Sequence, residues 1–260
     1  MPAEVHETII VEQQGAARWI RLNRPERRNA ITDQMIAELG DAVADAAADR
    51  SVRVLVIAAA GTAFCAGADL GDSPNARPSL STLEASTELF NSIEDFPQPV
   101  IGVVQGIACA GGLELLLCCD LILASENATF ADIHAGVGLI PGAGGAWRLP
   151  RRVGLGVAKQ MLFTGDVYSS AEMREVGLVN HVVPADSLQD AADELVRKLS
   201  NRSPLGLAAM KRLANSAFDV ERDIHMALAL EENARHLETH DYAEGLNAMR
   251  EKRQPVYAWA

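Results

Sequence analysis

One glutamate lies inside the most apolar part of the chain, where an unpaired carboxylate is costly. Glu114 is flanked by Leu113 and by three leucines at 115–117. Burying a carboxylate costs free energy unless it is hydrogen-bonded or used in chemistry. The preceding pair Gly111-Gly112 suits a helix start at which backbone must approach a ligand closely. We therefore expect an acid or base at Glu114, and backbone N–H groups just before it that stabilise an oxygen gaining negative charge.

A second segment, residues 130–145, reads FADIHAGVGLIPGAGG and is rich in glycine. His134 lies in it, two residues after Asp132, and histidine can act as an acid or a base near neutral pH. From the residues alone, His134 is more simply a core histidine with satisfied hydrogen bonds. Glu114 likewise has a structural alternative, as a first-turn acid favoured by the helix dipole by under about 1 kcal/mol.

Several other kinds of site are disfavoured. The glycine run 142–145 lacks the acidic residue that follows a dinucleotide-binding loop in a βαβ unit. The chain contains neither G-x-S-x-G nor H-E-x-x-H, which removes two enzyme classes, and no ligand cluster suggests a metal. Arg148, Arg151 and Arg152 are expected to form a solvated helix face rather than a phosphate site.

Composition limits the class of protein. The 260 residues are 48% hydrophobic, enough for one large domain, and carry a net charge of −12 without a basic stripe. Nucleic acid binding is therefore not expected, although an anionic small molecule needs only a locally positive pocket. The four cysteines fit neither zinc spacing nor a disulfide framework, so we expect buried free thiols in a reducing cytoplasm. We expect no signal peptide and no membrane span, because polar residues and glycines interrupt the apolar region 100–124.

The elements that must position these residues alternate between strands and helices. The first half of the chain predicts strands over 8–11, 17–22, 52–59, 100–104 and 121–124, and helices over 32–48, 83–93 and from 112. Segment 73–79 reads as polar and mobile. The second half predicts a helical stretch over 147–162, a capping box from Ser169 to Glu172, a strand over 179–183, and helices from 186 onward. This order predicts an α/β layer architecture over residues 1–200, followed by a helical region over 201–260.

Taken together, these fragments resemble the crotonase, or enoyl-CoA hydratase/isomerase, superfamily. The resemblance runs through nearly the whole chain. The matching fragments, in order, are LNRP at 22–25 and NA at 29–30, AF-x-AGAD at 63–69, PVI-x-V-x-G-x-A-x-GG-x-EL at 99–115, CD at 119–120, IPG-x-GG at 140–145, RL at 148–149, FTGD at 163–166 and EKR at 251–253. Each fragment alone is weak, but their number and order are highly specific.

The resemblance implies a spiral of ββα turns with a C-terminal helical region, assembled as a homotrimer or a dimer of trimers. It implies an acyl-CoA thioester as the partner, with CoA as part of the substrate and no separate cofactor. The thioester oxygen would lie between the backbone N–H groups of Ala68 and Gly111, which stabilise the enolate charge. The expected substrate and CoA contacts are Arg28, Ala30, Ala66, Asp69, Leu70 and, from an adjoining subunit, Lys252.

One departure from the family pattern matters most. Hydratases of the family place two glutamates at the substrate; the first matches Glu114, and the second falls on His134. Adding water across a double bond needs one proton removed and one delivered. The resemblance therefore implies an enoyl-CoA hydratase that uses Glu114 with His134. The alternatives are another crotonase reaction (isomerisation, thioester hydrolysis or C–C cleavage) run by the same pair, and an acyl-CoA binding protein without turnover.

Overall fold

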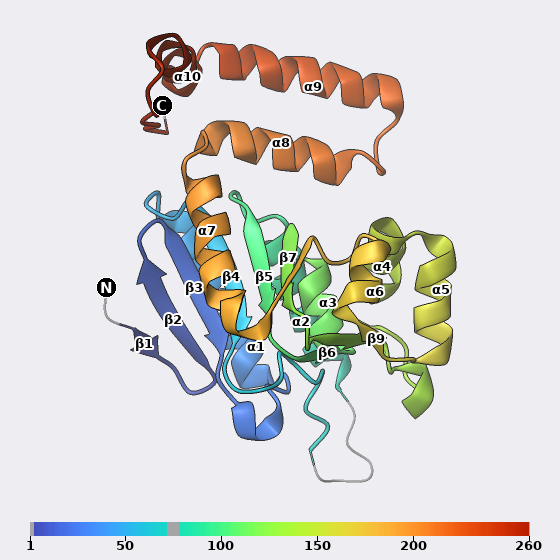
Figure 1. The fold of residues 1–260 in the computed structure, drawn as a ribbon. Coiled ribbons are helices and arrows are strands. Elements are labelled where there is room, and N and C mark those ends of the chain that lie inside the picture. Colours follow the sequence, from blue (N-terminus) through green and yellow to red (C-terminus); the bar gives the residue numbers. More distant parts are fainter. Residues whose placement is uncertain (1–2, 72–77, 260) are drawn as a thin grey trace.

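The structure, a computed structural model, describes residues 3–71 and 78–259 (Figure 1). Its first half contains β1 (Glu4–Val5), β2 (Ile9–Gln14), β3 (Ala17–Leu22), η1 (Pro25–Arg27), α1 (Asp33–Ala48), β4 (Val54–Ala59), α2 (Leu80–Glu94), β5 (Val100–Val104), β6 (Ile107–Cys109), α3 (Gly111–Leu117), β7 (Leu121–Ser125) and β8 (Thr129–Ala131). Its second half contains η2 (Ala135–Val137), α4 (Gly145–Val153), α5 (Leu155–Thr164), β9 (Tyr168–Ser169), α6 (Ser170–Glu175), β10 (His181–Val183), η3 (Ala185–Ser187), α7 (Leu188–Ser200), α8 (Pro204–Ser216), α9 (Arg222–Leu237) and α10 (His240–Glu251). Most of the segment predicted to be mobile lies outside the described residues.

The strands form two sheets that the chain visits in turn. The larger sheet has the order β1-β2-β3-β4-β5-β7-β10, and its pairings from β3 to β10 are all parallel. The smaller sheet has the order β6-β8-β9, and a parallel bridge joins Cys65, which follows β4, to Ala108 of β6. Each of the strands β4, β5 and β7 is thus followed by a short extended segment in the second layer. The predicted spiral of ββα turns is confirmed.

Helices cover both faces of the large sheet. On one face α1, α2 and α3 bury their apolar sides together with the sheet in the main core, which includes Met35, Phe90 and Leu116. On the other face α7 runs across the sheet and packs Leu188 and Ala192 against inward side chains such as those of β4 and β5 (Figure 1). These parallel strands are buried on both faces, which explains their unbroken apolar sequences.

Several local predictions hold. The hairpin of β2 and β3 is antiparallel, and Thr32 caps α1 by accepting a hydrogen bond from the Met35 amide. Ser169 and Glu172 form the predicted capping box, and Ser203 caps α8. All four cysteines are buried and free.

Residues 147–162 are helical as predicted, and Gly154, with φ of 77°, divides them into α4 and α5. The prediction that the three arginines of α4 form a solvated helix face is wrong. Arg148 is only 4% exposed, and Arg152 donates to the backbone carbonyl of Cys119; Arg151 alone is exposed. The spacing of arginines on a short helix did not reveal which of them turns inward.

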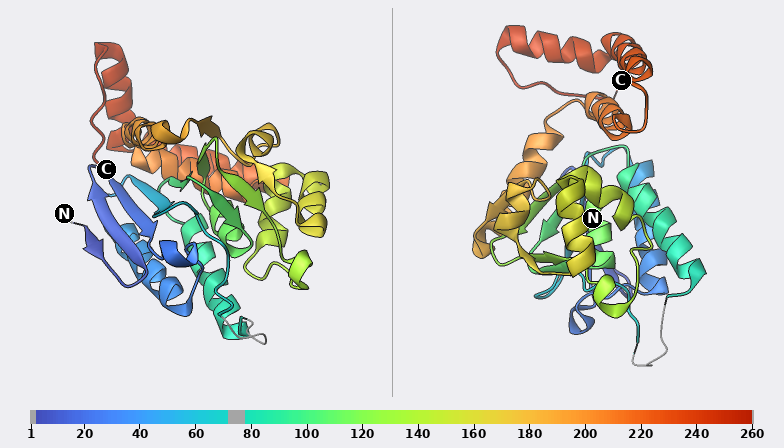
Figure 2. Two further views of the ribbon diagram at one scale, coloured as in Figure 1. Left: turned by 60° about the horizontal axis from the view of Figure 1, so that its bottom comes forward. Right: turned by 90° about the vertical axis from the view of Figure 1, so that its right-hand side faces the viewer.

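The last three helices lie together at one end of the molecule (Figures 1 and 2). Lys211 of α8 joins them to the core by an ion pair with Asp120, 2.7 Å between Nζ and Oδ2. None of the residues of α9 is buried within this chain. A boundary near residue 200 remains a prediction. Among the residues that the structure describes, no helix is both long and apolar enough to cross a membrane.

Candidate active site

A cavity of about 290 Å³ opens beside the start of α3. Glu114 and His134 are its titratable lining groups among the described residues, and Thr82 and Ser86 add hydroxyls. The rest of the wall is mainly apolar, with Ile31, Leu70, Leu83, Phe90, Ile133, Val137, Leu139 and Ile140. The cavity therefore joins two acid–base groups to an apolar compartment, an arrangement typical of small-molecule sites.

Glu114 is held by backbone amides of the loop that precedes α4. Its side chain is almost fully buried, and Oε1 accepts hydrogen bonds from the amides of Ala143 (2.9 Å) and Gly145 (2.8 Å). Burial raises the pKa of this carboxyl, while the two amide hydrogen bonds and His134 act against the increase. One oxygen is therefore fixed and satisfied, and Oε2 is the oxygen that faces His134.

Two glycines make this placement possible. A Cβ on Gly145 would lie 2.9 Å from Cγ of Glu114, and a Cβ on Gly112 would lie 2.4 Å from the carbonyl oxygen of Cys65. Real Cβ atoms do not approach backbone so closely, so α3 can pack on the Cys65 segment only with glycine at position 112. The glycines that suggested a ligand site thus also serve the packing around Glu114.

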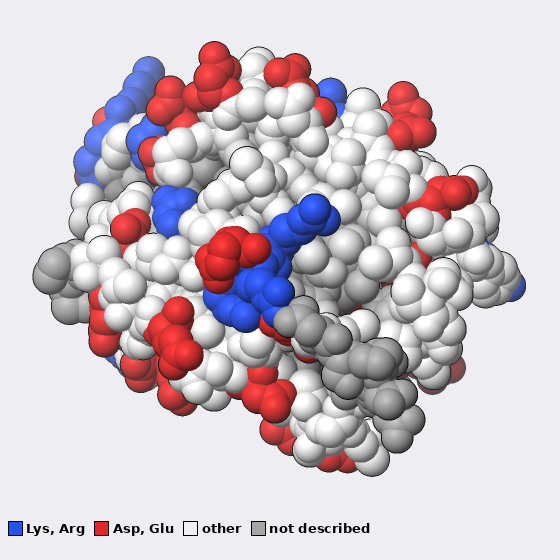
Figure 3. Space-filling model, turned by 90° about the horizontal axis from the view of Figure 1, so that it is seen from below, with Lys and Arg blue, Asp and Glu red and all other residues white. Residues whose placement is uncertain are grey.

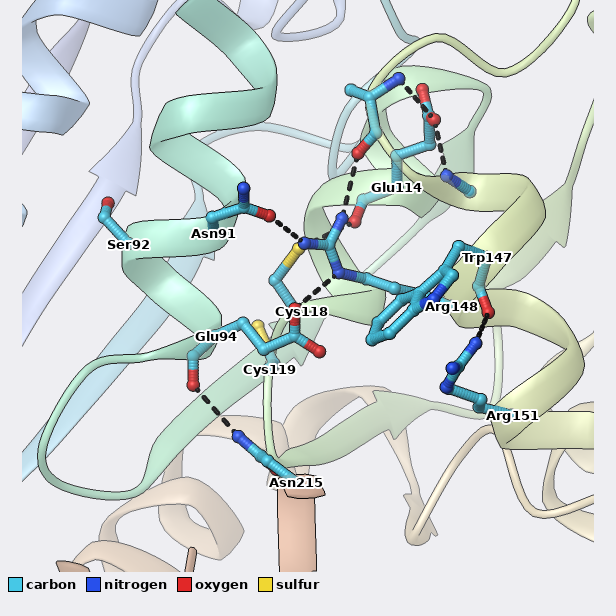
Figure 4. Close-up of polar contacts among 12 residues, drawn as sticks. Asn91, Ser92, Glu94, Glu114, Cys118, Cys119, Trp147, Arg148, Arg151 and Asn215 are labelled. Carbon is cyan, nitrogen blue, oxygen red and sulfur yellow. Dashed lines mark hydrogen bonds and ion pairs between the residues drawn. The ribbon is translucent and has the colours of Figure 1, made fainter. Parts of the chain in front are cut away.

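Arg148 of α4 supports the loop that holds Glu114. Its guanidinium donates to the Ala143 carbonyl (2.9 Å), to Oδ1 of Asn91 (2.6 Å) and to Oε2 of Glu94 (2.8 Å). Figure 4 shows Arg148 between α2, which carries Asn91 and Glu94, and the loop beside Glu114. Because the Ala143 amide donates to Glu114 while its carbonyl accepts from Arg148, one peptide segment connects the buried arginine to the candidate base.

His134 faces Glu114 across the cavity. Its Nε2 lies 4.0 Å from Oε2 of Glu114, and its Nδ1 lies 2.8 Å from Oδ1 of Asp132. The same Asp132 oxygen also accepts the backbone amide of His134 at 3.2 Å, and Asp132 is 1% exposed. Asp132, two residues before His134 in the sequence, therefore contacts the imidazole and orients it.

The charges on both sides of His134 favour its protonated form. Burial lowers the pKa of the imidazole, but the hydrogen bond that it donates to Asp132, the charge of Asp132 and the charge of Glu114 outweigh burial and raise the pKa above its ordinary value. The pKa of Glu114 is raised as well. The site thus holds a histidine and a glutamate whose protonation states depend on each other.

The two backbone amides expected to bind an oxygen lie next to each other. An ideal Cβ built on Gly111 would lie 3.6 Å from the amide nitrogen of Ala68, and both residues line the cavity. The backbone of Ile31 donates a hydrogen bond to the Gly67 carbonyl and accepts one from the Asp69 amide. These two hydrogen bonds do not involve the amide of Ala68 between them. Gly111 is the first residue of α3, where an amide has no acceptor within the helix. Ala110 before it has φ of 48°, an unusual value for a residue with a Cβ.

The remaining predicted contact residues are distributed unevenly. Ala66 and Leu70 line the cavity. Asp69 accepts from Arg24 and from the Gly71 amide, and these hydrogen bonds hold its pKa below the usual value. Ala30 accepts from Arg24 through its carbonyl. Their roles toward a substrate remain predictions.

Arg28 and Lys252 are exposed and lie at different places. The Arg28 carbonyl accepts from the Ala66 amide, which puts Arg28 beside the loop that lines the cavity. Figure 3 shows Lys and Arg side chains gathered on the lower face, the edge at which the loops around η1 lie in Figure 1. Lys252 ends α10, in the C-terminal helices. Among the described residues, no group of three or more His, Cys, Asp or Glu side chains could hold a metal ion.

Sequence reasoning missed three features of this site. The sequence predicts a solvated Arg148, and it shows Ala143 and Gly145 only as part of a glycine-rich run. Asp132 was noted for its spacing, without its hydrogen bond to His134. The sequence carries a signal for each of them: RL at 148–149 and IPG-x-GG at 140–145 are among the matched fragments, and Asp132 lies two residues before His134.

Comparisons with known proteins agree with this fold. The sequence model for the enoyl-CoA hydratase/isomerase family matches residues 12–259. A crotonyl-CoA hydratase of Syntrophomonas wolfei is 36% identical over 258 residues, which cover 96% of this chain and 97% of that protein. The mitochondrial enoyl-CoA hydratase domain-containing protein 2 of Mus musculus is 39% identical and covers 92% of this chain and 83% of its own length. The crystal structure of an enoyl-CoA hydratase from Bacillus anthracis superimposes with a TM-score of 0.94 at 32% identity, covering 98% of this chain and all of that one.

Proposed function

The chain belongs to the enoyl-CoA hydratase/isomerase family, and from this premise we propose that it adds water to the double bond of a 2-enoyl-CoA thioester. The observation that carries the proposal is the pair of Glu114 and His134, 4.0 Å apart in one cavity whose rim offers two adjacent backbone amides. Such a pair can remove a proton from water and deliver one to carbon within a single site.

The amides of Ala68 and Gly111 would receive the thioester oxygen. Attack of water on the β-carbon moves charge onto that oxygen as an enolate forms. Fixed N–H groups stabilise this charge more in the transition state than in the ground state, which is the requirement for catalysis. Removing one such donor typically costs about 10²–10³-fold in kcat, so the amide pair supplies a large share of the rate.

Glu114 and His134 would supply the base and the acid. A water molecule between them and the β-carbon loses a proton to one group, and the α-carbon gains a proton from the other. After product release, proton exchange between the two restores the starting state. The reaction consumes only water and the enoyl thioester, and it needs neither a metal nor a separate cofactor.

The size and the apolar wall of the cavity favour a substrate with a short, apolar acyl group. About 290 Å³ is the lower end of the usual range for ligand sites, and the wall beyond Glu114 is made of Leu83, Phe90 and Leu139 among other apolar side chains. We propose that the CoA moiety extends outward past Ala66 toward Arg28, with Ala30, Asp69 and Leu70 shaping the entrance. Lys252 would reach the CoA phosphates of a neighbouring subunit.

The exposed apolar side chains of the C-terminal helices favour assembly into a homotrimer or a dimer of trimers. Ile224, Leu228 and Leu230 of α9 are exposed in the single chain, with α8 contributing Met210. Large apolar side chains in such numbers on one element are typical of a surface that another subunit covers. The proposed location is the cytoplasm, where the four free, buried cysteines stay reduced.

A second reaction of the same site is double-bond isomerisation, favoured by the fact that one acid–base pair can also move a proton between two carbons. Thioester hydrolysis, C–C cleavage and binding without turnover are further alternatives. The test is to incubate the protein with crotonyl-CoA, 3-butenoyl-CoA, butyryl-CoA and a 2-enoyl series of increasing length. We expect 3-hydroxyacyl-CoA from the short 2-enoyl thioesters. Faster isomerisation of 3-butenoyl-CoA, or faster release of free CoA, would replace hydration by the corresponding reaction.

A further inference from the structure

The pair of Glu114 and His134 leaves open which group is the acid. The resting pair can be a carboxylate facing an imidazolium, or a neutral carboxylic acid facing a neutral imidazole. Burial disfavours charge on both groups, so the neutral combination is the default in an apolar cavity. The two states assign opposite roles to the two residues. Something else in the site must choose between them.

Asp132 is the group placed to choose. Its Oδ1 accepts the His134 amide at 3.2 Å and lies 2.8 Å from Nδ1 of the same residue. An ionised carboxylate only accepts hydrogen bonds, so the hydrogen lies on Nδ1. The imidazole is thereby fixed at one nitrogen by a buried carboxylate, and its other nitrogen faces Glu114.

The charges around His134 come from a small set of groups. Asp132 precedes it on the segment after β8, and Glu114 faces it from α3; these are the two charges that act on the imidazole. Cys109 of β6 lies close enough to Asp132 for their charges to interact. Burial raises the pKa of the Cys109 thiol, so this thiol is neutral. Helix α5 packs against η2, and its charged residue Lys159 is exposed. The imidazole is therefore flanked by two carboxylates.

We propose that Asp132 is a positioning residue that keeps His134 as the imidazolium acid and thereby leaves Glu114 as the carboxylate base. This inference rests on the proposed hydration. With Asp132 ionised, the three groups together carry a charge of −1, and the proton has one preferred place. Without that charge, the proton would pass to Glu114, whose pKa is already raised by burial, and the roles would reverse.

The assigned roles give a balanced reaction. Glu114 takes a proton from water as the water oxygen bonds to the β-carbon and the π electrons move toward the thioester oxygen. The resulting enolate takes a proton at the α-carbon from Nε2 of His134. Glu114 is then protonated and His134 neutral, with Oε2 and Nε2 4.0 Å apart. Transfer of that proton, directly after a small approach or through one water, restores the resting state.

The test is the isosteric variant Asp132→Asn, which keeps an oxygen acceptor and removes the charge. The His134 pKa is measured by NMR titration of the imidazole, with His134→Ala assigning its signal among the six histidines. We expect a wild-type pKa above about 6.5 and a value at least one unit lower in the variant. The basic limb of the kcat/KM profile, which reports the free enzyme, should move to lower pH equally, with KM changed less than about threefold. Asp45→Asn, on the exposed face of α1, removes one charge outside the cavity and should change neither.

A wild-type pKa at or below about 6.5, or an unchanged pKa in Asp132→Asn, would overturn the proposal. A lowered pKa with an unmoved basic limb would also overturn it, because His134 would then not be the acid. The NMR titration needs no turnover, so the two levels are separable. If the chain fails to hydrate any enoyl-CoA while Asp132 still controls the His134 pKa, the proposed function fails and the assignment of the proton stands.

Discussion

At the scale of single residues, Glu114 is held at a cost to the fold. Burial raises its pKa, so the folded state binds this proton more tightly than the unfolded chain does. The carboxylate therefore lowers stability as pH rises from the ordinary glutamate pKa through the raised folded value. His134 has the same pH dependence: its pKa is also raised, so its protonated form stabilises the fold below the unfolded pKa, and this contribution is lost as pH rises through the folded value. Glu114 therefore does not stabilise the fold at neutral pH, which agrees with the catalytic role proposed for it.

The effect of a substitution at position 134 on the hydration rate is expected to depend on the residue at position 132. His134→Glu would bring a third carboxylate within hydrogen-bonding distance of Asp132 and close to Glu114, and buried like charges raise one another's pKa. We expect hydration by His134→Glu to be at least about 10-fold slower than in the wild type, since a positioned acid contributes roughly 10²–10⁴-fold. Adding Asp132→Asn should recover much of the loss, because it restores a site with a single excess charge. The comparison is kcat of the two single variants and the double variant; independent, additive losses would contradict the coupling.

At the scale of elements, Arg148 of α4 connects α2 to the loop that holds Glu114. Arg148→Leu would leave the Glu94 carboxylate and the Ala143 carbonyl without their partner. Breaking a buried pair on one side costs roughly 3–5 kcal/mol, which corresponds to a decrease of about 6–20 °C in Tm. We expect kcat to fall as well, because Ala143 also holds Glu114. Tm from thermal unfolding and kcat are both measured.

The matched control lies on the same helix. Arg151 is exposed, with an ion pair to Asp219 and its guanidinium 3.6 Å from the Trp147 ring centroid. Exposed pairs are worth about 1 kcal/mol or less, so Arg151→Leu should shift Tm by only a few degrees. Equal effects of the two substitutions would show that burial of Arg148 is not what supports the loop.

The start of α3 offers a second paired test. Gly112→Ala would bring a Cβ 2.4 Å from the Cys65 carbonyl oxygen, whereas the nearest atom to a Cβ on Gly111 is Cδ1 of Ile31 at 3.4 Å. Overpacking against fixed backbone costs roughly 1–3 kcal/mol, so the free energy of unfolding should fall by that amount in Gly112→Ala and by much less in Gly111→Ala. Chemical denaturation measures both. A similar loss in the two variants would mean that the loop at Cys65 moves freely.

The elements that sequence reasoning predicted well are those that local patterns define. Apolar runs gave the buried parallel strands, and Thr32, Ser169 and Ser203 gave helix starts that the structure confirms. The short strands β6, β8 and β9 were not predicted, because their pairing depends on contacts between distant segments. The inward turn of Arg148 and the contact of Asp132 with His134 are likewise set by tertiary packing. Glu114 was predictable because a carboxylate among leucines is costly wherever it lies.

At the scale of the whole molecule, acidic charge surrounds a local basic cluster. The net charge of −12 argues for repulsion from anions in general, yet Lys and Arg side chains gather on the lower face (Figure 3). A CoA phosphate needs only that local field. The C-terminal helices, which carry exposed apolar side chains, lie at the other end of the molecule (Figure 1). The proposed substrate entrance and the proposed subunit interface are thus separate surfaces of one chain.

The assembly is testable by mass. For a 27.8 kDa chain, light scattering coupled to gel filtration should give about three or six times that value. Replacing Ile224 and Leu228 by serine should weaken association, since both are exposed on α9. The same double substitution on Val5 and Leu80, which are also exposed but lie outside the C-terminal helices, is the control. A monomer in the wild type would contradict the proposed trimer.

The central claim is that Glu114 and His134 together hydrate a 2-enoyl-CoA. Its most direct test is the rate at which crotonyl-CoA is converted to 3-hydroxybutyryl-CoA by the wild type, Glu114→Gln and His134→Ala, with the product identified. We predict turnover by the wild type and a fall in kcat of roughly 10²–10⁴-fold in each variant. Binding of the acyl-CoA should be retained, because each change removes a transition-state interaction. A folded wild type that does not hydrate crotonyl-CoA, or a His134→Ala variant as fast as the wild type, would contradict it.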